Sequence, residues 1–559
     1  MLTDIESRRA ALAARTPTWT PRTLDGFLEA VADEHPDRPL VVTDDKTVTY
    51  AEVAEWSRRL ADGLAALGAG PGRRVGLLMA NHLEFVPLKF AIARTGAAAI
   101  PFNFLYREEE LAYVLRQSRC ELLLTMSSFA GLNHLGMLAR IGALPDLRHV
   151  VVLPAPGDVV PDGMLDVEGL AALGDEHRGA SDAAGAAPDD LGDILFTSGT
   201  TGSPKGVMVT HDAVLRTAYA SALTCAFEDG RRILFSLPCY HMFGYVEGLL
   251  AAMVVGGAIV PRTAFSPADY VDAIEQHRPS EVLCVPTMTV ALLEHPDLAS
   301  RDLSSVVALL SGAAPAPARL WQRMQEELGI PECTTGYGMT ECGGAMTMTL
   351  PEDPIERHVE TVGRPKLAGV AGLADAAGAL CTYATVDPLS GEPLTGGGEG
   401  ELVSTGPTHM LGFWDKPEET ALALRGGWVH SGDLGVVGAD GYLQLTGRAK
   451  ELYKSGGELV MPKEVEELLT SQPGVSQAFA VGVPDDRWGE VGYAWVVADP
   501  GAELDPEALR ELCRARLARF KVPKHVLLIA ADELPTTPTG KVQKFRLVKR
   551  AVEALAADG

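Results

Sequence analysis

The sequence predicts an α/β fold in two parts: a large N-terminal domain of layered α/β sheets and a small, mobile α+β C-terminal domain. From about residue 40 onward, short β-rich runs alternate with helical patterns, which is typical of layered α/β sheets. A chain of 559 residues is also too long for a single hydrophobic core. A second change of pattern near residue 447 predicts a large domain over 1–447 and a small domain over 448–559.

Apolar runs in the large domain are expected to form buried parallel strands, because a strand covered on both faces reads as a nearly continuous hydrophobic stretch. The alternation begins with a strand at 74–79, a helix through 85–90 and a strand at 99–101. Further strands are expected at 121–125, 150–153 and 281–285. In the small domain the pattern predicts helices at 463–471 and 505–520 and strands at 478–483 and 493–497.

The composition excludes several classes of protein. A net charge of −26 opposes nonspecific binding to nucleic acid or to anionic membranes, which depends on an excess of Lys and Arg. The eight cysteines include no Cys-x-x-Cys pair and suit a reducing compartment. The N-terminus lacks the order of a signal peptide, and the longest apolar stretch, 249–260, is shorter than the roughly 20 residues of a spanning helix. We therefore expect a cytoplasmic protein without a membrane span.

A loop of small and hydroxylated residues at 197–206 says most about function. Its small residues let the backbone approach an anion, its hydroxyl and N–H groups donate to phosphate oxygens, and Lys205 supplies a charge for the outer phosphates. The spacing is not that of a Walker A loop. A flexible surface loop is the alternative, which the apolar run 207–209 disfavours. The predicted phosphate-binding residues are Thr197, Ser198, Gly199, Thr200, Thr201, Gly202 and Lys205.

Two further motifs suit a nucleotide. In the stretch 336–341, Gly336 precedes Tyr337, whose ring could cover an adenine face, while Thr340 donates to an α-phosphate and Glu341 holds Mg²⁺ beside phosphate oxygens. A simple helix start is the alternative reading of the Thr-Glu pair. Downstream, Asp433 lies in a tight turn where its carboxylate can accept both ribose hydroxyls, although such a turn is usually structural.

With two more segments, these motifs resemble the adenylate-forming superfamily, which includes acyl-CoA synthetases, peptide-synthetase adenylation domains and beetle luciferases. The resemblance implies that Arg448 reaches the same ribose as Asp433 and that Lys450 lies at the hinge between the domains. It implies that Lys541, after a Pro- and Thr-rich lead, is the lysine that bridges the carboxylate and the α-phosphate. It also places His241 beside the acyl carboxylate, although a lone histidine among apolar residues is more often a core group. The segment that forms the pantetheine tunnel contains Lys454, counted among the catalytic residues, with Gly456 and Gly457.

The resemblance also implies which residues line the acyl pocket. The matching positions are Tyr240, Gly312, Gly338, Gly344 and Ala345, of which four are Gly or Ala. Small side chains leave volume, and no acidic residue stands where amino-acid-activating relatives bind an α-amine. We therefore expect a medium to long aliphatic acid or an aryl acid rather than an amino acid.

The resulting hypothesis is an AMP-forming acid–thiol ligase that uses ATP, Mg²⁺ and CoA. A carboxylic acid is converted to acyl-AMP with release of pyrophosphate, and the acyl group then passes to CoA. Three alternatives keep the adenylation or the nucleotide site: an acceptor that is a carrier protein or an amine, an ATP-dependent diazotase that activates nitrite toward an arylamine, and a nucleotide sensor without turnover. A monomer or a homodimer is expected.

Overall fold

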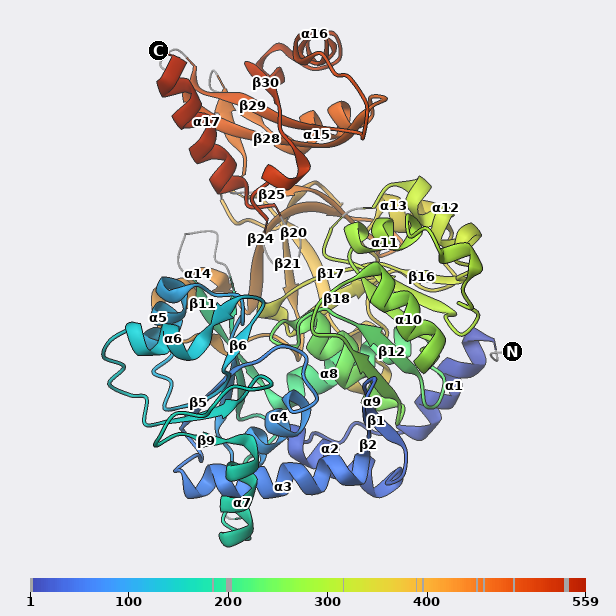
Figure 1. Cartoon of the computed structure of the whole chain (residues 1–559). Coiled ribbons are helices and arrows are strands. Elements are labelled where there is room, and N and C mark those ends of the chain that lie inside the picture. Colours follow the sequence, from blue (N-terminus) through green and yellow to red (C-terminus); the bar gives the residue numbers. More distant parts are fainter. Residues whose placement is uncertain are drawn as a thin grey trace. The chain divides into compact units, whose positions relative to one another are not determined.

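The computed structural model describes residues 4–182, 185–197, 204–314, 316–388, 390–394, 397–448, 451–455, 458–485, 488–536 and 542–558 (Figure 1). The chain forms two compact units. Unit 1 consists of Met1–Tyr383 and Ser404–His430, and unit 2 of Ala384–Val403 and Ser431–Gly559. The α/β class, with a larger N-terminal and a smaller C-terminal part, is confirmed; the domain limit at 447/448 stays a prediction.

Unit 1 contains two large sheets. The first has seven strands in the order β16 (Glu332–Thr334), β15 (Ala308–Ser311), β14 (Glu281–Cys284), β12 (Arg232–Phe235), β13 (Ala258–Pro261), β1 (Pro39–Val42) and β2 (Thr47–Thr49). The second has eight, in the order β22 (Gly412–Phe413), β11 (Lys205–Thr210), β10 (Leu191–Thr197), β4 (Ala98–Pro101), β3 (Arg74–Leu78), β5 (Leu122–Met126), β8 (His149–Leu153) and β9 (Leu165–Asp166). The first sheet is parallel from β16 to β1 and the second from β10 to β9, as the apolar runs predict.

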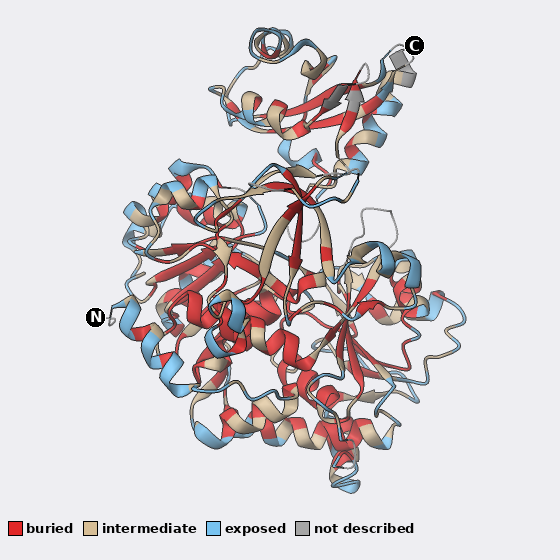
Figure 2. Ribbon diagram, turned by 180° about the vertical axis from the view of Figure 1, so that it is seen from behind, coloured by how far each residue is buried: buried red, intermediate tan, exposed pale blue. Residues whose placement is uncertain are grey.

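The central parallel strands of the two sheets, such as β4, β5, β13 and β14, are buried on both faces, which explains their apolar sequences (Figure 2). The helices between them are α1 (Ile5–Arg15), α2 (Leu24–Glu34), α3 (Tyr50–Ala66), α4 (Phe85–Arg94), α5 (Glu108–Gln117), α6 (His134–Arg140), α7 (Val167–Glu176), α8 (His211–Thr224), α9 (Ala251–Val254), α10 (Pro267–His277), α11 (Pro286–Leu293), α12 (Ala318–Glu327), α13 (Ile355–Glu360) and α14 (Pro417–Ala423). Thr49 begins α3 with a capping box, since its hydroxyl accepts from the Glu52 N–H and the Glu52 carboxylate accepts from the Thr49 N–H.

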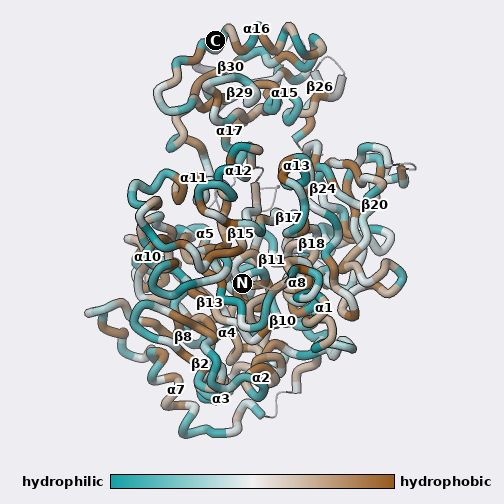
Figure 3. Tube along the Cα trace, turned by 90° about the vertical axis from the view of Figure 1, so that its right-hand side faces the viewer, coloured by the Kyte–Doolittle hydropathy of each residue, from teal (hydrophilic) through white to brown (hydrophobic). Residues whose placement is uncertain are grey.

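Unit 2 contains a sheet with helices on both faces. Its strands run in the order β27 (Glu458–Val460), β26 (Tyr453–Ser455), β29 (Gly489–Ala498) and β28 (Val475–Asp485), with β30 (His525–Leu528) parallel to β29. Alternate residues of β29 face opposite cores, one built with α15 (Pro462–Thr470) and α16 (Pro506–Arg516), the other with α17 (Lys544–Asp558). Along α16 hydrophilic and hydrophobic residues are mixed, as a helix with one buried face requires (Figure 3).

One predicted helix is too long. The pattern 505–520 predicts a single helix, but α16 ends at Arg516 and Leu517 is extended, with φ −108° and ψ 155°. The extended backbone packs the Leu517 side chain against the core of α15 and α16. A short 3₁₀ turn, Arg519–Lys521, takes the place of the last predicted helical turn.

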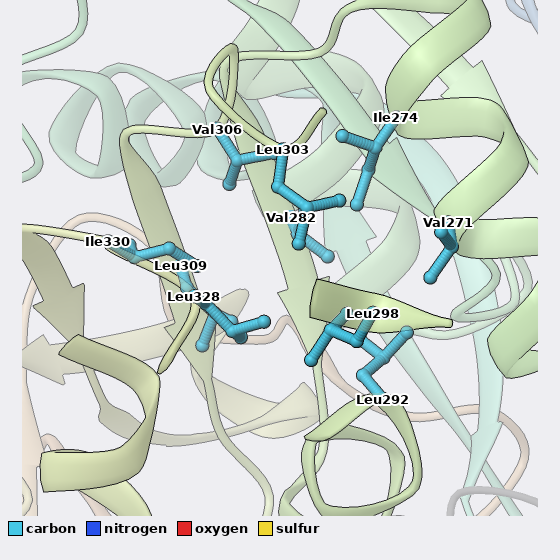
Figure 4. Close-up of a pocket in the computed structure, with 10 residues that line it drawn as sticks. All are labelled: Val271, Ile274, Val282, Leu292, Leu298, Leu303, Val306, Leu309, Leu328 and Ile330. Carbon is cyan, nitrogen blue, oxygen red and sulfur yellow. The ribbon is translucent and has the colours of Figure 1, made fainter. Parts of the chain in front are cut away.

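Among the residues that the structure describes, no helix is long and apolar enough to cross a bilayer. All eight cysteines are free and buried, and burial raises the pKa of each thiol, for example to about 12 at Cys120. A small apolar cavity lies among α10, α11, β14 and β15 (Figure 4). Its lining has no polar group to bind a ligand, so the cavity is a packing defect of the core. The lining residues are Val271, Ile274, Val282, Leu292, Leu298, Leu303, Val306, Leu309, Leu328 and Ile330.

Helices α3 and α7 approach each other through two glycines. A Cβ built on Gly174 would lie 1.8 Å from the Arg59 carbonyl oxygen, and one on Gly63 would lie 2.2 Å from the Leu170 carbonyl oxygen. The atoms in the way belong to helix backbones, which cannot rotate aside as a flexible side chain does. Contact between these two helices therefore depends on the absence of side chains at both positions.

Gly174→Ala is expected to lower the free energy of unfolding by about 1–3 kcal/mol, the usual cost of overpacking a close contact. Guanidinium unfolding followed by circular dichroism measures the change. Gly70→Ala is the control, because the nearest atom to a Cβ there, the Thr95 carbonyl oxygen, is 4.0 Å away. An unchanged unfolding midpoint for Gly174→Ala would contradict the close helix contact.

Candidate functional site

The predicted phosphate loop joins two antiparallel strands. Thr197 ends β10 and pairs with Lys205, the first residue of β11, so the strand expected after the loop is present. The Lys205 Nζ atom lies 5.2 Å from the centre of the Phe413 ring. Ser198, Gly199, Thr200, Thr201 and Gly202 lie outside the described residues. The strand pair therefore holds Thr197 and Lys205, the two described ends of the loop, opposite each other.

A buried polar network supports β10 behind this loop. Lys89 of α4 and Asp193 of β10 are fully buried, and the Lys89 Nζ and Asp193 Oδ1 atoms are 2.9 Å apart. The Tyr245 hydroxyl donates to Asp193 Oδ2 over 3.1 Å. His211, at the start of α8, packs against β10, since a Cβ on Gly192 would lie 2.9 Å from its Nδ1 atom. Lys89, Tyr245 and His211, from three different helices, thus contact β10, the strand that leads into the phosphate loop.

The motif at 336–341 forms a tight hairpin. Strand β17 (Gly336–Met339) pairs with β18 (Gly344–Met348), and a 3₁₀ turn, Thr340–Cys342, connects them. Gly338 must be glycine here, because a Cβ would lie 2.0 Å from the Gly344 carbonyl oxygen. Gly344 itself has φ +128°, a conformation that other residues rarely adopt. The close strand pair holds the buried Thr340 and the half-buried Glu341 at its end.

One segment ties this turn to the phosphate hairpin. The Met410 N–H donates to the Glu341 carbonyl oxygen, and the next amide, of Leu411, donates to the Met208 carbonyl oxygen on β11, each over 2.8 Å. The sequence-predicted residues Lys205, Thr340 and Glu341 therefore belong to one braced assembly. The aromatic ring expected over adenine, that of Tyr337, lies 6.4 Å from the ring of Tyr383.

The loop that carries Tyr240 and His241 is fixed by a buried amide. Asn81 donates from Nδ2 to the Leu237 carbonyl oxygen over 3.0 Å and accepts from the Cys239 N–H at Oδ1 over 2.9 Å. The His241 side chain is exposed, and its Nδ1 atom accepts from the Phe243 N–H over 3.2 Å. His241 is thus not a core histidine, the alternative that the sequence left open.

The predicted acyl-pocket residues gather around a π-helix, η1 (Phe243–Leu250), that follows this loop. A Cβ on Gly312 would lie 3.3 Å from the Phe243 ring, so Gly312 faces the start of η1. Further along η1, the Glu247 carboxylate accepts from the Ala345 N–H over 3.3 Å. π-helical turns occur frequently at functional sites. The structure therefore brings Gly312, directly after β15, and Ala345 of β18 to one helix.

Three aromatic residues that the sequence did not single out form a series of ring contacts that begins at Tyr240. The Phe104 ring meets the Tyr240 ring edge-on at 5.4 Å and the Phe129 ring at 5.0 Å, and His82 meets Phe129 at 6.2 Å. We call these four residues the aromatic edge. Each follows the carboxyl end of a parallel strand, β3, β4, β5 or β12, where α/β proteins bind ligands. The sequence could have indicated His82, Phe104 and Phe129, because each is an aromatic residue a few positions after a predicted buried strand.

In unit 2, the predicted ribose residues contact each other. Asp433 and Arg448 are paired across strands β24 (Trp428–Val437) and β25 (Leu443–Arg448), and the Arg448 Nε and Asp433 Oδ1 atoms are 2.9 Å apart. The Gly432 N–H donates to the Glu401 carboxylate over 3.0 Å, which braces the turn. Lys450, Gly456, Gly457 and Lys541 lie outside the described residues, as does the side chain of Lys454.

Comparison with known proteins identifies this arrangement. A family model described as AMP-binding enzyme matches residues 28–414, and a second, AMP-binding enzyme C-terminal domain, matches residues 464–541. The chain belongs to the AMP-binding enzyme family. It is an AMP-forming ligase of the acyl-CoA synthetase type, which confirms the predicted superfamily and its use of ATP and CoA.

Relatives of this AMP-binding enzyme are similar over most of their length. A methyl-dioxo-octahydro-indenyl-propanoyl:CoA ligase of Mycobacterium tuberculosis is 37% identical over 527 residues, covering 94% of this chain and 98% of the relative. A feruloyl-CoA synthase of an Amycolatopsis species is 36% identical over 503 residues, covering 90% and 94%. A crystal structure of an anthranilate CoA ligase in complex with anthranoyl-AMP is 26% identical with a TM-score of 0.81, covering 98% of this chain and 100% of that one.

The network behind the phosphate hairpin predicts an acid-sensitive enzyme. Burial, with the nearby charge of Lys89, lowers the pKa of His211 from its ordinary 6.5 to about 4. The unfolded chain therefore binds an extra proton between these pH values, and the free energy of unfolding falls as the pH is lowered through that window. At about 1.4 kcal/mol for each pH unit, His211 accounts for a loss of about 3 kcal/mol between pH 6.5 and 4.

Urea unfolding at pH 7 and pH 4 tests this expectation. His211→Gln removes the titrating group and should lose about 3 kcal/mol less stability than the parent over this range. His149→Gln replaces an exposed histidine and is the control, expected to follow the parent. Equal losses for His211→Gln and the parent would show that protonation of His211 does not drive the change.

Proposed function

We propose that this AMP-binding enzyme activates a carboxylic acid whose acyl group carries an apolar ring and transfers it to CoA. The aromatic edge is the observation that supports this substrate class. It continues from Tyr240, a predicted pocket residue, along Phe104 to Phe129. Rings pack well in edge-on contact with other rings, whereas a polar or charged acyl group gains nothing from such a surface.

Three of the similar proteins are named for ring-bearing acids and support this substrate class. Their names specify a bicyclic indenyl-propanoyl group, a feruloyl group and an anthranoyl group. All three acyl groups place a ring at or near the carboxylate. Small residues at Gly312, Gly344 and Ala345 leave room for a ring where a larger side chain would exclude it.

In the first half-reaction, a carboxylate oxygen of the acid attacks the α-phosphorus of ATP and pyrophosphate leaves. Thr340 donates to the α-phosphate, while Lys205 and Lys541 offset the negative charge that gathers where two anions meet. Glu341 would hold Mg²⁺, which would supply positive charge to the phosphate oxygens. Within the described part of the chain no cluster of three His, Cys, Asp or Glu residues could hold a metal, and a single carboxylate with phosphate oxygens and waters is an ordinary set for Mg²⁺.

In the second half-reaction, the sulfur of CoA attacks the acyl carbon, the thiol proton is released and AMP leaves. Rotation of the small domain about Lys450 brings Lys454, Gly456 and Gly457 to the pantetheine arm. Asp433 and Arg448 bind the ribose. CoA is the acceptor rather than a carrier protein, and a cytoplasmic monomer or homodimer is sufficient for both steps.

The deciding experiment is ATP-dependent pyrophosphate release with ferulic, benzoic, octanoic and palmitic acids and with phenylalanine, with and without CoA. Mass spectrometry distinguishes acyl-AMP from acyl-CoA. We expect ring acids to give the highest kcat/KM and acyl-CoA to form only when CoA is present. Lys541→Ala should lose pyrophosphate release by about 100-fold or more, because it removes a charge that stabilises the transition state. Turnover only with phenylalanine, or only with nitrite or an amine added, would contradict the proposal.

Phe129→Leu tests the aromatic edge directly. It should raise the KM for ferulic acid about 3- to 10-fold, the value of one aromatic contact, and leave the KM for octanoic acid within about twofold. Phe265→Leu alters a separate aromatic pair, 4.9 Å from Tyr270, and should change neither value. Equal effects of Phe129→Leu on both acids would show that the edge does not select rings.

A further inference from the structure

Lys366 and Glu247 form an ion pair that is completely enclosed in unit 1. Their side chains are 0% and 2% exposed, and the Lys366 Nζ atom lies 2.9 Å from Glu247 Oε1 and 3.2 Å from Oε2. The third donor of the ammonium group reaches the Ser221 hydroxyl on α8 at 2.6 Å. Each of the three ammonium protons thus has an acceptor.

The same carboxylate contacts the wall of the predicted acyl pocket. Glu247 Oε1 accepts from the Ala345 N–H over 3.3 Å, and it would lie 3.5 Å from a Cβ on Gly344. The Lys366 backbone approaches β18 from another direction, because its N–H donates to the Met346 carbonyl oxygen over 3.0 Å. One ion pair therefore joins α8, η1, β18 and the segment after β19 (Arg364–Pro365).

An enclosed ion pair is a poor way to gain stability. Removing two charges from water costs several kcal/mol per ion, and well-packed apolar residues of similar volume often stabilise a core equally well. The pair instead fixes the relative positions of the four elements, because its hydrogen bonds form only when donors and acceptors on all four are correctly placed. A side chain without an acceptor at position 247 would remove this hydrogen-bond partner of the Ala345 N–H.

We propose that Glu247 and Lys366 are positioning residues, which hold the β18 backbone at Gly344 and Ala345 and so set the width of the acyl pocket. The effect on catalysis rests on the proposed function, whereas the positioning of β18 by this pair is independent of it. The pair touches neither reactant. We expect its larger effect to be on the acid, because the pair contacts the backbone at Ala345, whereas the Thr340–Cys342 turn of the same hairpin is also held by the Met410 segment.

Two double variants isolate the hydrogen bond to Ala345. Glu247→Gln with Lys366→Met leaves no unpaired charge and keeps a side-chain oxygen for the Ala345 N–H. Glu247→Met with Lys366→Met also leaves no charge, has nearly the same volume, and removes that oxygen. The two proteins differ only at residue 247, in the side-chain amide whose oxygen can accept from Ala345, and the effect of Lys366→Met is common to both.

The first readout is amide hydrogen exchange of the peptide that spans β18, with a β14 peptide as internal control. We expect exchange at β18 to be about tenfold faster in the Met/Met variant than in the Gln/Met variant, and β14 to be unchanged, because one buried amide hydrogen bond is lost. The second readout is kinetic. The KM for ferulic acid should be about tenfold higher in the Met/Met variant, with the KM for ATP within about twofold.

Equal exchange at β18 in the two double variants would overturn the proposal, as would equal changes in the KM for both substrates. If the parent enzyme activates no acid of the panel, the proposed function fails, while the exchange measurement still decides whether the pair positions β18. Ser221→Ala provides a further test that keeps both charges. It should raise exchange at β18 and the KM for ferulic acid about twofold by removing one ammonium acceptor, and parent-like values would also overturn the proposal.

Discussion

Two parallel strands that follow each other in the chain are joined by a connection that crosses back over the sheet. All strands of a parallel sheet therefore have their carboxyl ends on the same side. This polarity sends the loops after β3, β4 and β5 to one edge of the eight-stranded sheet. The loop after β12, from the other sheet, meets that edge where the Tyr240 and Phe104 rings touch. The position of the aromatic edge thus follows from strand direction before any side chain is considered.

The site of unit 1 is supported by buried polar groups rather than by apolar packing alone. Behind the phosphate hairpin, Lys89 and Asp193 are paired without access to water, and Glu247 with Lys366 repeats the device behind β18. Hydrophobic contacts tolerate small shifts of one element past another, whereas a hydrogen-bonded charge pair does not. Such pairs suit places where a strand must stay aligned to a fraction of an ångström, as beside reacting groups.

Local patterns in the sequence predict much of this molecule. The strand pair around the phosphate loop was expected because apolar runs flank it. The motif at 336–341 was singled out by its resemblance to a known family, but the hairpin that carries Thr340 and Glu341 at its end was not predicted. The end of α16 was missed because a tertiary contact of Leu517 overrides a helical pattern. The pairing of Glu247 with Lys366 was beyond prediction, since the two residues are 119 positions apart and each resembles a surface residue in sequence.

The burial of every cysteine has a practical consequence. Thiolates are the species that react with maleimides, and a thiol that is both enclosed and held in its protonated form reacts slowly. We therefore expect the native cysteines to give little background labelling with thiol-directed dyes. A pair of cysteines placed at exposed positions, one in each unit, would be labelled selectively. Energy transfer between the dyes would then follow domain motion during turnover without replacement of any native cysteine.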